Sequence, residues 1–273
     1  MKIGFIGTGN MGGALINGYA RSDHNSQIYI FDKNPKQAAR FQNTDGVRIL
    51  DKLNDLIEYS DIIILAVKPN IFDNILPAIR NYLNVLDEIA CDISSKVFVS
   101  IAAGISINYI KKQLGESTKI VRSMPNLNAM VGLGMAGIAR DDMVNDDELA
   151  SVMEIFESTG KAIEINENLM DTVTGISGSS PAYAYMFIEA LMDCAVKNGM
   201  KRDDARIFAS QATLGAAVTV MESGIDPKTL VDNVCSPGGT TIEAVTKLKQ
   251  NGFQADIEEA MNAAVEKSKK MTK

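Results

Sequence analysis

The sequence predicts an α/β protein in which a Rossmann-type, doubly wound and mostly parallel sheet is followed by an all-α domain. Two observations predict this. Over residues 1–165, short apolar segments alternate with helix-like stretches, which is the order that builds a parallel sheet. Over residues 166–273 we find no convincing strand pattern. A chain of 273 residues is long enough for two domains, and we place their boundary between residues 165 and 166.

The predicted strands are short and rich in Ile and Val. Ile62–Val67 is continuously apolar, as expected of a strand buried on both faces of a parallel sheet. We expect strands at Ile3–Ile6, Ile28–Phe31, Val47–Leu50, Ile62–Val67, Val97–Ile101, Lys119–Arg122, Met135–Ala139 and Ala162–Ile165. The helices expected between them begin near Met11 and cover Pro35–Gln42, Leu53–Tyr59, Ile71–Leu83, Ile107–Leu114 and Asp147–Ser158.

The second half reads as five helices, at Ser180–Asn198, Asp203–Glu222, Pro227–Asn233, Thr240–Gln250 and Phe253–Lys269. Within the second of them, Ala205–Ala217 is rich in Ala, Gly and Ser and carries little polar surface. Such a helix needs burial on most sides. Because a helical domain of this size has few places to bury it, we expect an extensive interface between subunits.

A glycine fingerprint opens the chain. The first predicted strand leads directly into G-x-G-x-x-G, formed by Gly7, Gly9 and Gly12, and a helix follows. In a dinucleotide site the first glycine allows a tight turn, the second lets the backbone approach the pyrophosphate, and the third lets helix and strand pack closely. The helix N-terminus then offers N–H groups to the phosphates. We therefore predict cofactor binding by Ile6, Gly7, Thr8, Gly9, Asn10, Met11 and Gly12.

An acidic residue supports this prediction. Asp32 closes the second predicted strand, about 20 residues after Gly12, where an acid accepts hydrogen bonds from the adenosine ribose.

Composition excludes several other classes of function. The net charge is −7, whereas nucleic acids and anionic membrane surfaces require basic patches. Three cysteines without C-x-x-C spacing fit a reducing compartment and no metal site. No signal-peptide pattern precedes the first strand, and the most apolar helix is too short to span a bilayer. We expect a cytoplasmic protein with no nucleic-acid or membrane partner.

The histidine content excludes another mechanism. Many hydroxy-acid dehydrogenases use a histidine as general acid and base. The only histidine, His24, falls in the turn before the second strand, at the end of the sheet away from the expected ligand site. We therefore interpret His24 as a surface residue.

Two loops of the second half carry candidate chemistry. Ser177–Tyr183 (SGSSPAY) opens a long helix, although serines before a proline also cap helices. Ser236–Thr241 (SPGGTT) exposes backbone N–H groups and hydroxyls at a helix start, which suits a small carboxylate; a plain loop with a threonine cap is the alternative.

Taken together, the motifs resemble those of the pyrroline-5-carboxylate reductases over nearly the whole chain. They are FIGTGNMGGALINGY (5–19), LAVKP (65–69), SIAAGI (100–105), RSMPN (122–126), VGLG (131–134), SGSSPAYAYMFIEAL (177–191) and SPGGTTIEA (236–244). The chain departs from the family at Leu127-Asn128, where Thr-Pro is usual, and at Ser180, where glycine is usual.

The resemblance implies reduction of the cyclic imine 1-pyrroline-5-carboxylate to L-proline by NADPH or NADH. It implies a cofactor domain over 1–165, and a dimerisation and substrate domain over 166–273, in a homodimer or a larger homo-oligomer with an active site built from both domains. It places Ala66, Val67, Lys68, Pro69 and Asn126 along the cofactor, and Ser236, Gly239, Thr240 and Thr241 at the substrate. Among these, Thr241 is the candidate catalytic residue, as hydrogen-bond partner of the imine nitrogen.

An imine substrate agrees with the missing histidine. A protonated cyclic imine is already electrophilic at carbon, so hydride addition needs orientation rather than a strong protein acid. Two alternatives remain. A β-hydroxyacid dehydrogenase would share the glycine opening but needs a lysine soon after Ser177–Pro181, and none follows before Lys197. A non-catalytic dinucleotide sensor would not need the loop Ser236–Thr241.

The choice of cofactor rests on opposing arguments. Asp32 favours NADH, because its charge would repel the 2′-phosphate of NADPH. The family more often uses NADPH, and Lys33 could neutralise Asp32, whereas Arg40 lies a helix away in sequence. We expect NADH to be usable and NADPH also to be accepted.

Overall fold

The computed structural model describes residues 1–22, 26–88 and 93–273. His24 and Cys91 lie outside the described residues. The chain forms two compact units, residues 1–179 with 264–273 and residues 180–263, which are described separately. The sheet ends at residue 164, next to the boundary expected at 165/166, whereas the two units divide at residues 179/180.

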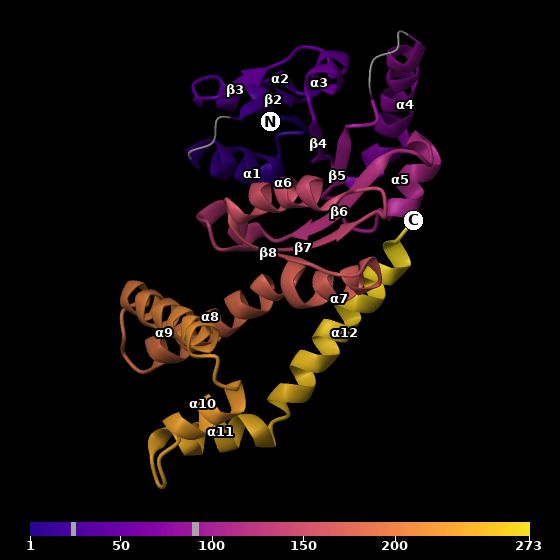
Figure 1. Cartoon of the computed structure of the whole chain (residues 1–273). Coiled ribbons are helices and arrows are strands. Elements are labelled where there is room, and N and C mark those ends of the chain that lie inside the picture. Colours follow the sequence, from indigo (N-terminus) through magenta and orange to yellow (C-terminus); the bar gives the residue numbers. More distant parts are fainter. Residues whose placement is uncertain (23–25, 89–92) are drawn as a thin grey trace. The chain divides into compact units, whose positions relative to one another are not determined.

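The first unit contains one eight-stranded sheet in the order β3-β2-β1-β4-β5-β6-β7-β8 (Figure 1). All neighbouring strands are parallel except β6 and β7, which confirms the expected mostly parallel, doubly wound sheet. The strands are β1 (Lys2–Ile6), β2 (Gln27–Phe31), β3 (Val47–Ile49), β4 (Ile62–Leu65), β5 (Val97–Ser100), β6 (Lys119–Pro125), β7 (Gly134–Arg140) and β8 (Gly160–Glu164).

All eight strands differ from their predicted bounds by one to three residues, and strand pairing explains the differences at β6 and β4. β6 continues past Arg122 to Pro125, because it pairs antiparallel with β7, with Met124 opposite Gly137. β4 stops at Leu65, where its register with β5 ends. The residues after Leu65 are therefore free to form a loop at the carboxyl edge of the sheet.

Helices cover both faces of the sheet. One face packs on α1 (Asn10–Arg21) and α6 (Asp146–Glu157), which also contact each other. The other face packs on α3 (Leu53–Tyr59), α4 (Phe72–Glu88) and α5 (Ile107–Leu114). Short helical segments connect them, namely α2 (Pro35–Ala38), η1 (Ala39–Phe41), η2 (Pro69–Ile71) and η3 (Leu127–Val131).

Helix α4 is longer than the predicted Ile71–Leu83 because its apolar stripe continues. Phe72, Leu76, Ile79 and Leu83 are buried, and Leu86 extends the same stripe at helical spacing.

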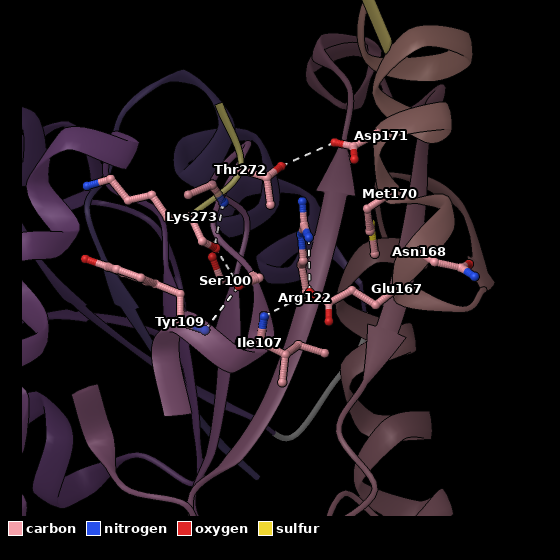
Figure 2. A network of polar contacts seen from close by, with 12 residues as sticks. Ser100, Ile107, Tyr109, Arg122, Glu167, Asn168, Met170, Asp171, Thr272 and Lys273 are labelled. Carbon is pink, nitrogen blue, oxygen red and sulfur yellow. Dashed lines mark hydrogen bonds and ion pairs between the residues drawn. The ribbon is translucent and has the colours of Figure 1, made fainter. Parts of the chain in front are cut away.

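The first unit ends in a group of polar contacts between segments far apart in sequence. After β8 follow η4 (Glu167–Leu169), α7 (Met170–Val173) and the π-helix η5 (Thr174–Gly178). Asp171 accepts a hydrogen bond from Thr272, and Arg122 pairs with Glu167, as Figure 2 shows. The Oε1 atom of Glu167 also accepts a hydrogen bond from the backbone N–H of Ile107.

The second unit is helical, as the sequence predicts. Its helices are α8 (Ser180–Lys197), α9 (Arg202–Ser223), α10 (Pro227–Val234) and α11 (Thr240–Gln250), and α12 (Phe253–Met271) begins in it. Helices α8 and α9 pack against each other, which buries Ala205 and Ala209. Among the described residues, no helix has the length and apolar character needed to cross a membrane.

Candidate active site

The glycine loop joins β1 to α1 at the carboxyl end of β1. Gly7 has a positive φ of 98°, and a Cβ added to it would lie 2.7 Å from the carbonyl oxygen of Ala66. A Cβ on Gly12 would lie 2.5 Å from the carbonyl oxygen of Gly7. Both positions therefore require glycine, the first for its turn and the second for the close packing of helix and strand.

Gly9 is different, because its surroundings are open. A Cβ added to Gly9 would meet no atom within 4 Å. Gly9 is the N-cap residue of α1 and provides no side-chain cap, so the N–H groups of the first turn donate no hydrogen bond to a capping side chain. An exposed helix N-terminus of this kind fits a phosphate group.

Asp32 forms hydrogen bonds with Thr8, the residue between Gly7 and Gly9. Its Oδ2 atom accepts hydrogen bonds from the backbone N–H of Thr8 (2.8 Å) and from the hydroxyl of Thr8 (2.9 Å). Its Oδ1 atom accepts one from the backbone N–H of Asn34 (2.8 Å). A carboxylate offers about four lone-pair sites, so one remains for a ribose hydroxyl. Asp32 thus holds the loop in place and can still contact a nucleotide.

Arg40 holds Thr8 from the other side, a contact that the sequence interpretation missed. Its Nη2 atom donates a hydrogen bond to the carbonyl oxygen of Thr8 (2.5 Å). Arg40 is distant from the loop in sequence, but α2 and η1 return the chain to it. The only sequence signal for this contact was an arginine at the end of a predicted helix that follows the second strand.

A cavity of about 230 Å³ lies beside the loop. It is lined by Gly9, Asn10, Gly13, Ala14, Asn17, Arg21, Arg40, Phe41 and Met130. Two arginines and two asparagines are therefore among the residues that line this cavity.

The segment after β4 adjoins the same loop. β4 pairs with β1, and the backbone N–H of Ala66 donates to the carbonyl oxygen of Ile6 (2.9 Å). Val67, Lys68 and Pro69 follow, and the side chain of Lys68 is exposed. The structure thus brings together the predicted cofactor residues from the ends of β1, β2 and β4.

Asn126, at the end of β6, makes other contacts with its amide. Its Nδ2 atom donates to the carbonyl and hydroxyl oxygens of Ser177 (both 3.2 Å), and its Oδ1 atom accepts from the backbone N–H of Met135 (3.2 Å). Ser177 belongs to the π-helix η5, an element that occurs often at functional sites. Asn126 thus links β6, β7 and the start of the motif Ser177–Tyr183.

The predicted substrate residues lie together in the second unit, at the start of α11. Gly238 has a positive φ of 69°, and the backbone N–H of Gly239 donates to the carbonyl oxygen of Ser236 (3.0 Å). Gly239 is the N-cap residue of α11 and, like Gly9, provides no side-chain cap. A threonine therefore does not cap this helix, whereas a plain loop stays the alternative to a substrate site. Thr240 and Thr241 form the first turn, beside N–H groups that suit a small anion.

The described part of the chain contains no group of three or more His, Cys, Asp or Glu side chains arranged to hold a metal ion.

Comparison with known proteins leads to one family over the whole length. The model of the family described as pyrroline-5-carboxylate reductase dimerisation matches residues 167–271, and that of NADP oxidoreductase, coenzyme F420-dependent, matches residues 2–104. The pyrroline-5-carboxylate reductase of Escherichia coli (strain K12) is 42% identical over 274 residues, which cover 100% of this chain and 98% of that protein. The one of Methanosarcina acetivorans is 38% identical, with the same coverage.

A solved structure agrees with the sequence relatives. The pyrroline carboxylate reductase of Plasmodium falciparum, determined with NADP bound, matches with a TM-score of 0.86 and 34% identity. The match covers 100% of this chain and 98% of that one.

Proposed function

The chain belongs to the pyrroline-5-carboxylate reductase family. We propose that the glycine loop binds the cofactor of that reaction and that the loop at the start of α11 binds its substrate. The protein is an NAD(P)H-dependent oxidoreductase that acts on a C=N bond. It reduces 1-pyrroline-5-carboxylate to L-proline, the last step of proline biosynthesis. The observation that carries the proposal is the open, uncapped N-terminus of α1 next to the glycine loop that Asp32 fastens.

The glycine loop and its neighbours hold the cofactor in this proposal. The N–H groups after Gly9 bind the pyrophosphate, and the free lone-pair site of Asp32 binds the adenosine ribose. The segment Ala66–Pro69 lines the same edge of the sheet. Asn126 is included because it directly precedes η3, whose Met130 lines the cavity at Gly9 and Asn10.

The loop at the start of α11 binds the substrate. The backbone N–H groups near Gly239 and Thr240 bind the carboxylate, with the Ser236 hydroxyl nearby. The hydroxyl of Thr241 accepts a hydrogen bond from the protonated ring nitrogen. When bound, the reduced nicotinamide supplies the hydride that adds to the imine carbon, and the nitrogen keeps its proton as the amine forms. The protein therefore orients the imine and needs no strong acid.

For the cofactor we propose that NADH is usable and that NADPH is also accepted. Asp32 places a negative charge where a 2′-phosphate would lie. The test is the ratio of kcat/KM values with the two cofactors, in the native chain and in Asp32→Ser. The ratio should shift toward NADPH in the variant. Asp32→Asn, which keeps an acceptor for Thr8, is the matched control for loss of the loop contact.

The protein is a homo-oligomer, and we propose a dimer as its smallest active form, with larger assemblies built from it. In the single chain, α8 and α9 expose Met186 (70%), Phe208 (66%) and Ile207 (64%). Monomeric proteins rarely expose so many apolar side chains on neighbouring elements. Light scattering across a dilution series, with activity measured in parallel, tests this. A fully active monomer would contradict it.

The remaining proposals concern the two domains and the location of the protein. Residues 1–165 form the cofactor domain, and residues 166–273 form the dimerisation and substrate domain, a division supported by the family match over 167–271. The net charge of −7 supports the absence of a nucleic-acid partner, and the unpaired Cys194 and Cys235 support a cytoplasmic location.

The decisive experiment is an assay of NADPH and NADH oxidation on addition of 1-pyrroline-5-carboxylate, with proline measured as product. Proline should form with at least one cofactor. No proline with either cofactor would overturn the proposed function, and nucleotide binding without turnover would favour a sensor.

A further inference from the structure

Arg40 is a positively charged residue that contacts Thr8 in the glycine loop. Its guanidinium donates to the carbonyl oxygen of Thr8, while the N–H and hydroxyl of the same Thr8 donate to Asp32. One residue of the loop is therefore held between an acid and a base. Asp32 is the group expected to bind the adenosine ribose. Arg40 is connected to Asp32 through Thr8, because both side chains form hydrogen bonds with that residue.

The guanidinium of Arg40 is held in place by the protein but keeps N–H donors without a partner among the described residues. Besides the bond to Thr8, its Nε atom donates to the carbonyl oxygen of Gln37 (3.3 Å), and its Cζ atom lies 5.7 Å from the ring centroid of Phe41. An arginine has five N–H donors, and the two hydrogen bonds of Arg40 to described residues use two of them, which leaves three for a ligand. The side chain also lines the cavity beside Gly9 and Asn10.

An anchored guanidinium with free donors is well suited to a phosphate, because its planar fork can bind two oxygens at once. The cofactor has two candidate phosphate groups at this end of the loop. In the proposed cofactor site the N-terminus of α1 binds the pyrophosphate. Without a nearby positive charge, the 2′-phosphate of NADPH would be repelled by the negative charge of Asp32. Lys33 follows Asp32 in sequence, and its side chain is exposed and has no hydrogen bond or ion pair to the described residues.

We propose that Arg40 is the residue through which this site accepts the 2′-phosphate of NADPH, while Asp32 serves the ribose of NADH. The proposal rests on the proposed cofactor site. It assigns cofactor selectivity to the pair of residues that hold Thr8, and it explains how a loop with an acid at the end of β2 can take both cofactors.

The test compares binding of NADP⁺ and NAD⁺ by calorimetry, which needs neither imine nor turnover. Arg40→Met should weaken NADP⁺ binding by about ten-fold or more, as expected for loss of a charge-assisted hydrogen bond, and leave NAD⁺ binding nearly unchanged. Arg40→Lys keeps the charge and should retain most of the NADP⁺ affinity. Arg48→Met removes one positive charge from β3, away from the loop contacts, and is the matched control.

Three outcomes would overturn the proposal. Equal weakening of both nucleotides would mean that Arg40 serves the pyrophosphate or only the loop structure. Unchanged binding of both would remove Arg40 from the site, and so would an equal effect of Arg48→Met. The proposed function fails separately, if the unaltered chain binds neither nucleotide. A steeper loss of NADP⁺ affinity with salt in the unaltered chain than in Arg40→Met would support the charge contact.

Discussion

Ser268, near the end of α12, donates a hydrogen bond from its hydroxyl to the Oδ1 atom of Asp171 on α7, at 2.6 Å. The last residue of the chain, Lys273, also forms hydrogen bonds with the first unit. The backbone N–H of Lys273 donates to the carbonyl oxygen of Gly104 (2.9 Å), and the hydroxyl of Ser106 donates to the carbonyl oxygen of Lys273 (2.6 Å). Residues 264–273 are therefore part of the first unit, although they are last in sequence.

Gly104 is the position where this packing is tightest. Its φ is +71°, and a Cβ there would lie 2.8 Å from the carbonyl oxygen of Met271. We predict that Gly104→Ala lowers the free energy of unfolding by about 1–2 kcal/mol from backbone strain and by about 1–3 kcal/mol more from the clash. Gly132→Ala is the control, because its φ is +75° but no atom lies within 4 Å. Denaturant unfolding measures both, and equal losses would contradict the proposed clash.

Tyr109, Asp73 and Lys273 form a pH-dependent contact beside Gly104. The hydrogen bond to Asp73, and then burial, raise the pKa of Tyr109 to about 12. The hydrogen bonds from Lys273 and then from Tyr109 lower the pKa of Asp73 below its ordinary 3.8. The tyrosine's contribution to stability is thus complete below pH 10.0 and lost as pH rises through about 12. The aspartate's contribution is complete above pH 3.8 and lost as pH falls through its lowered value.

The phenol can be titrated by near-ultraviolet absorbance, as the difference between the native chain and Tyr109→Phe. The midpoint should lie above the ordinary value of 10.0 and should fall in Asp73→Asn. A midpoint at the ordinary value in the native chain would show that the contact to Asp73 does not form in solution.

Gly9 and Gly12 should respond differently to the same substitution. Gly9→Ala adds a methyl group into open space, so stability should hold while cofactor affinity falls, because the methyl group blocks the approach of the pyrophosphate. Gly12→Ala places a Cβ 2.5 Å from the carbonyl oxygen of Gly7 and should cost about 1–3 kcal/mol of stability. Thermal unfolding and nucleotide titration separate the two effects. Similar stability losses in both variants would be inconsistent with the open surroundings of Gly9.

Thr241 should matter for chemistry and not for folding. Thr241→Ala should lower kcat/KM for the imine by about ten-fold or more, since hydrogen bonds to charged groups contribute about 1.5–3 kcal/mol. Cys235→Ser, six positions earlier, should keep full activity and serves as the control for changes near this loop. Steady-state kinetics measure both, and unchanged kinetics in Thr241→Ala would remove it from the site.

The sequence alone determined the order of strands and helices, because each depends on local periodicity. The continuous apolar segment Ile62–Val67 predicted a buried strand, and the glycine spacing predicted the turn at Gly7 and the packing at Gly12. The five helices after residue 179 follow from breakers such as Gly224, Pro227 and Gly252, which act within a few residues of themselves.

Only the tertiary structure decided which distant residues meet. Arg40 reaches Thr8 because α2 and η1 turn back onto the sheet, and Asn126 reaches Ser177 because β6 extends beyond its predicted end. The contact of Ser268 with Asp171 joins residues almost a hundred positions apart. Local sequence propensity does not predict contacts between residues far apart in sequence, since these contacts form only when the chain folds into its tertiary structure. The cofactor site therefore stays a prediction from the sequence, whereas the fold decides which charged side chains lie around the glycine loop.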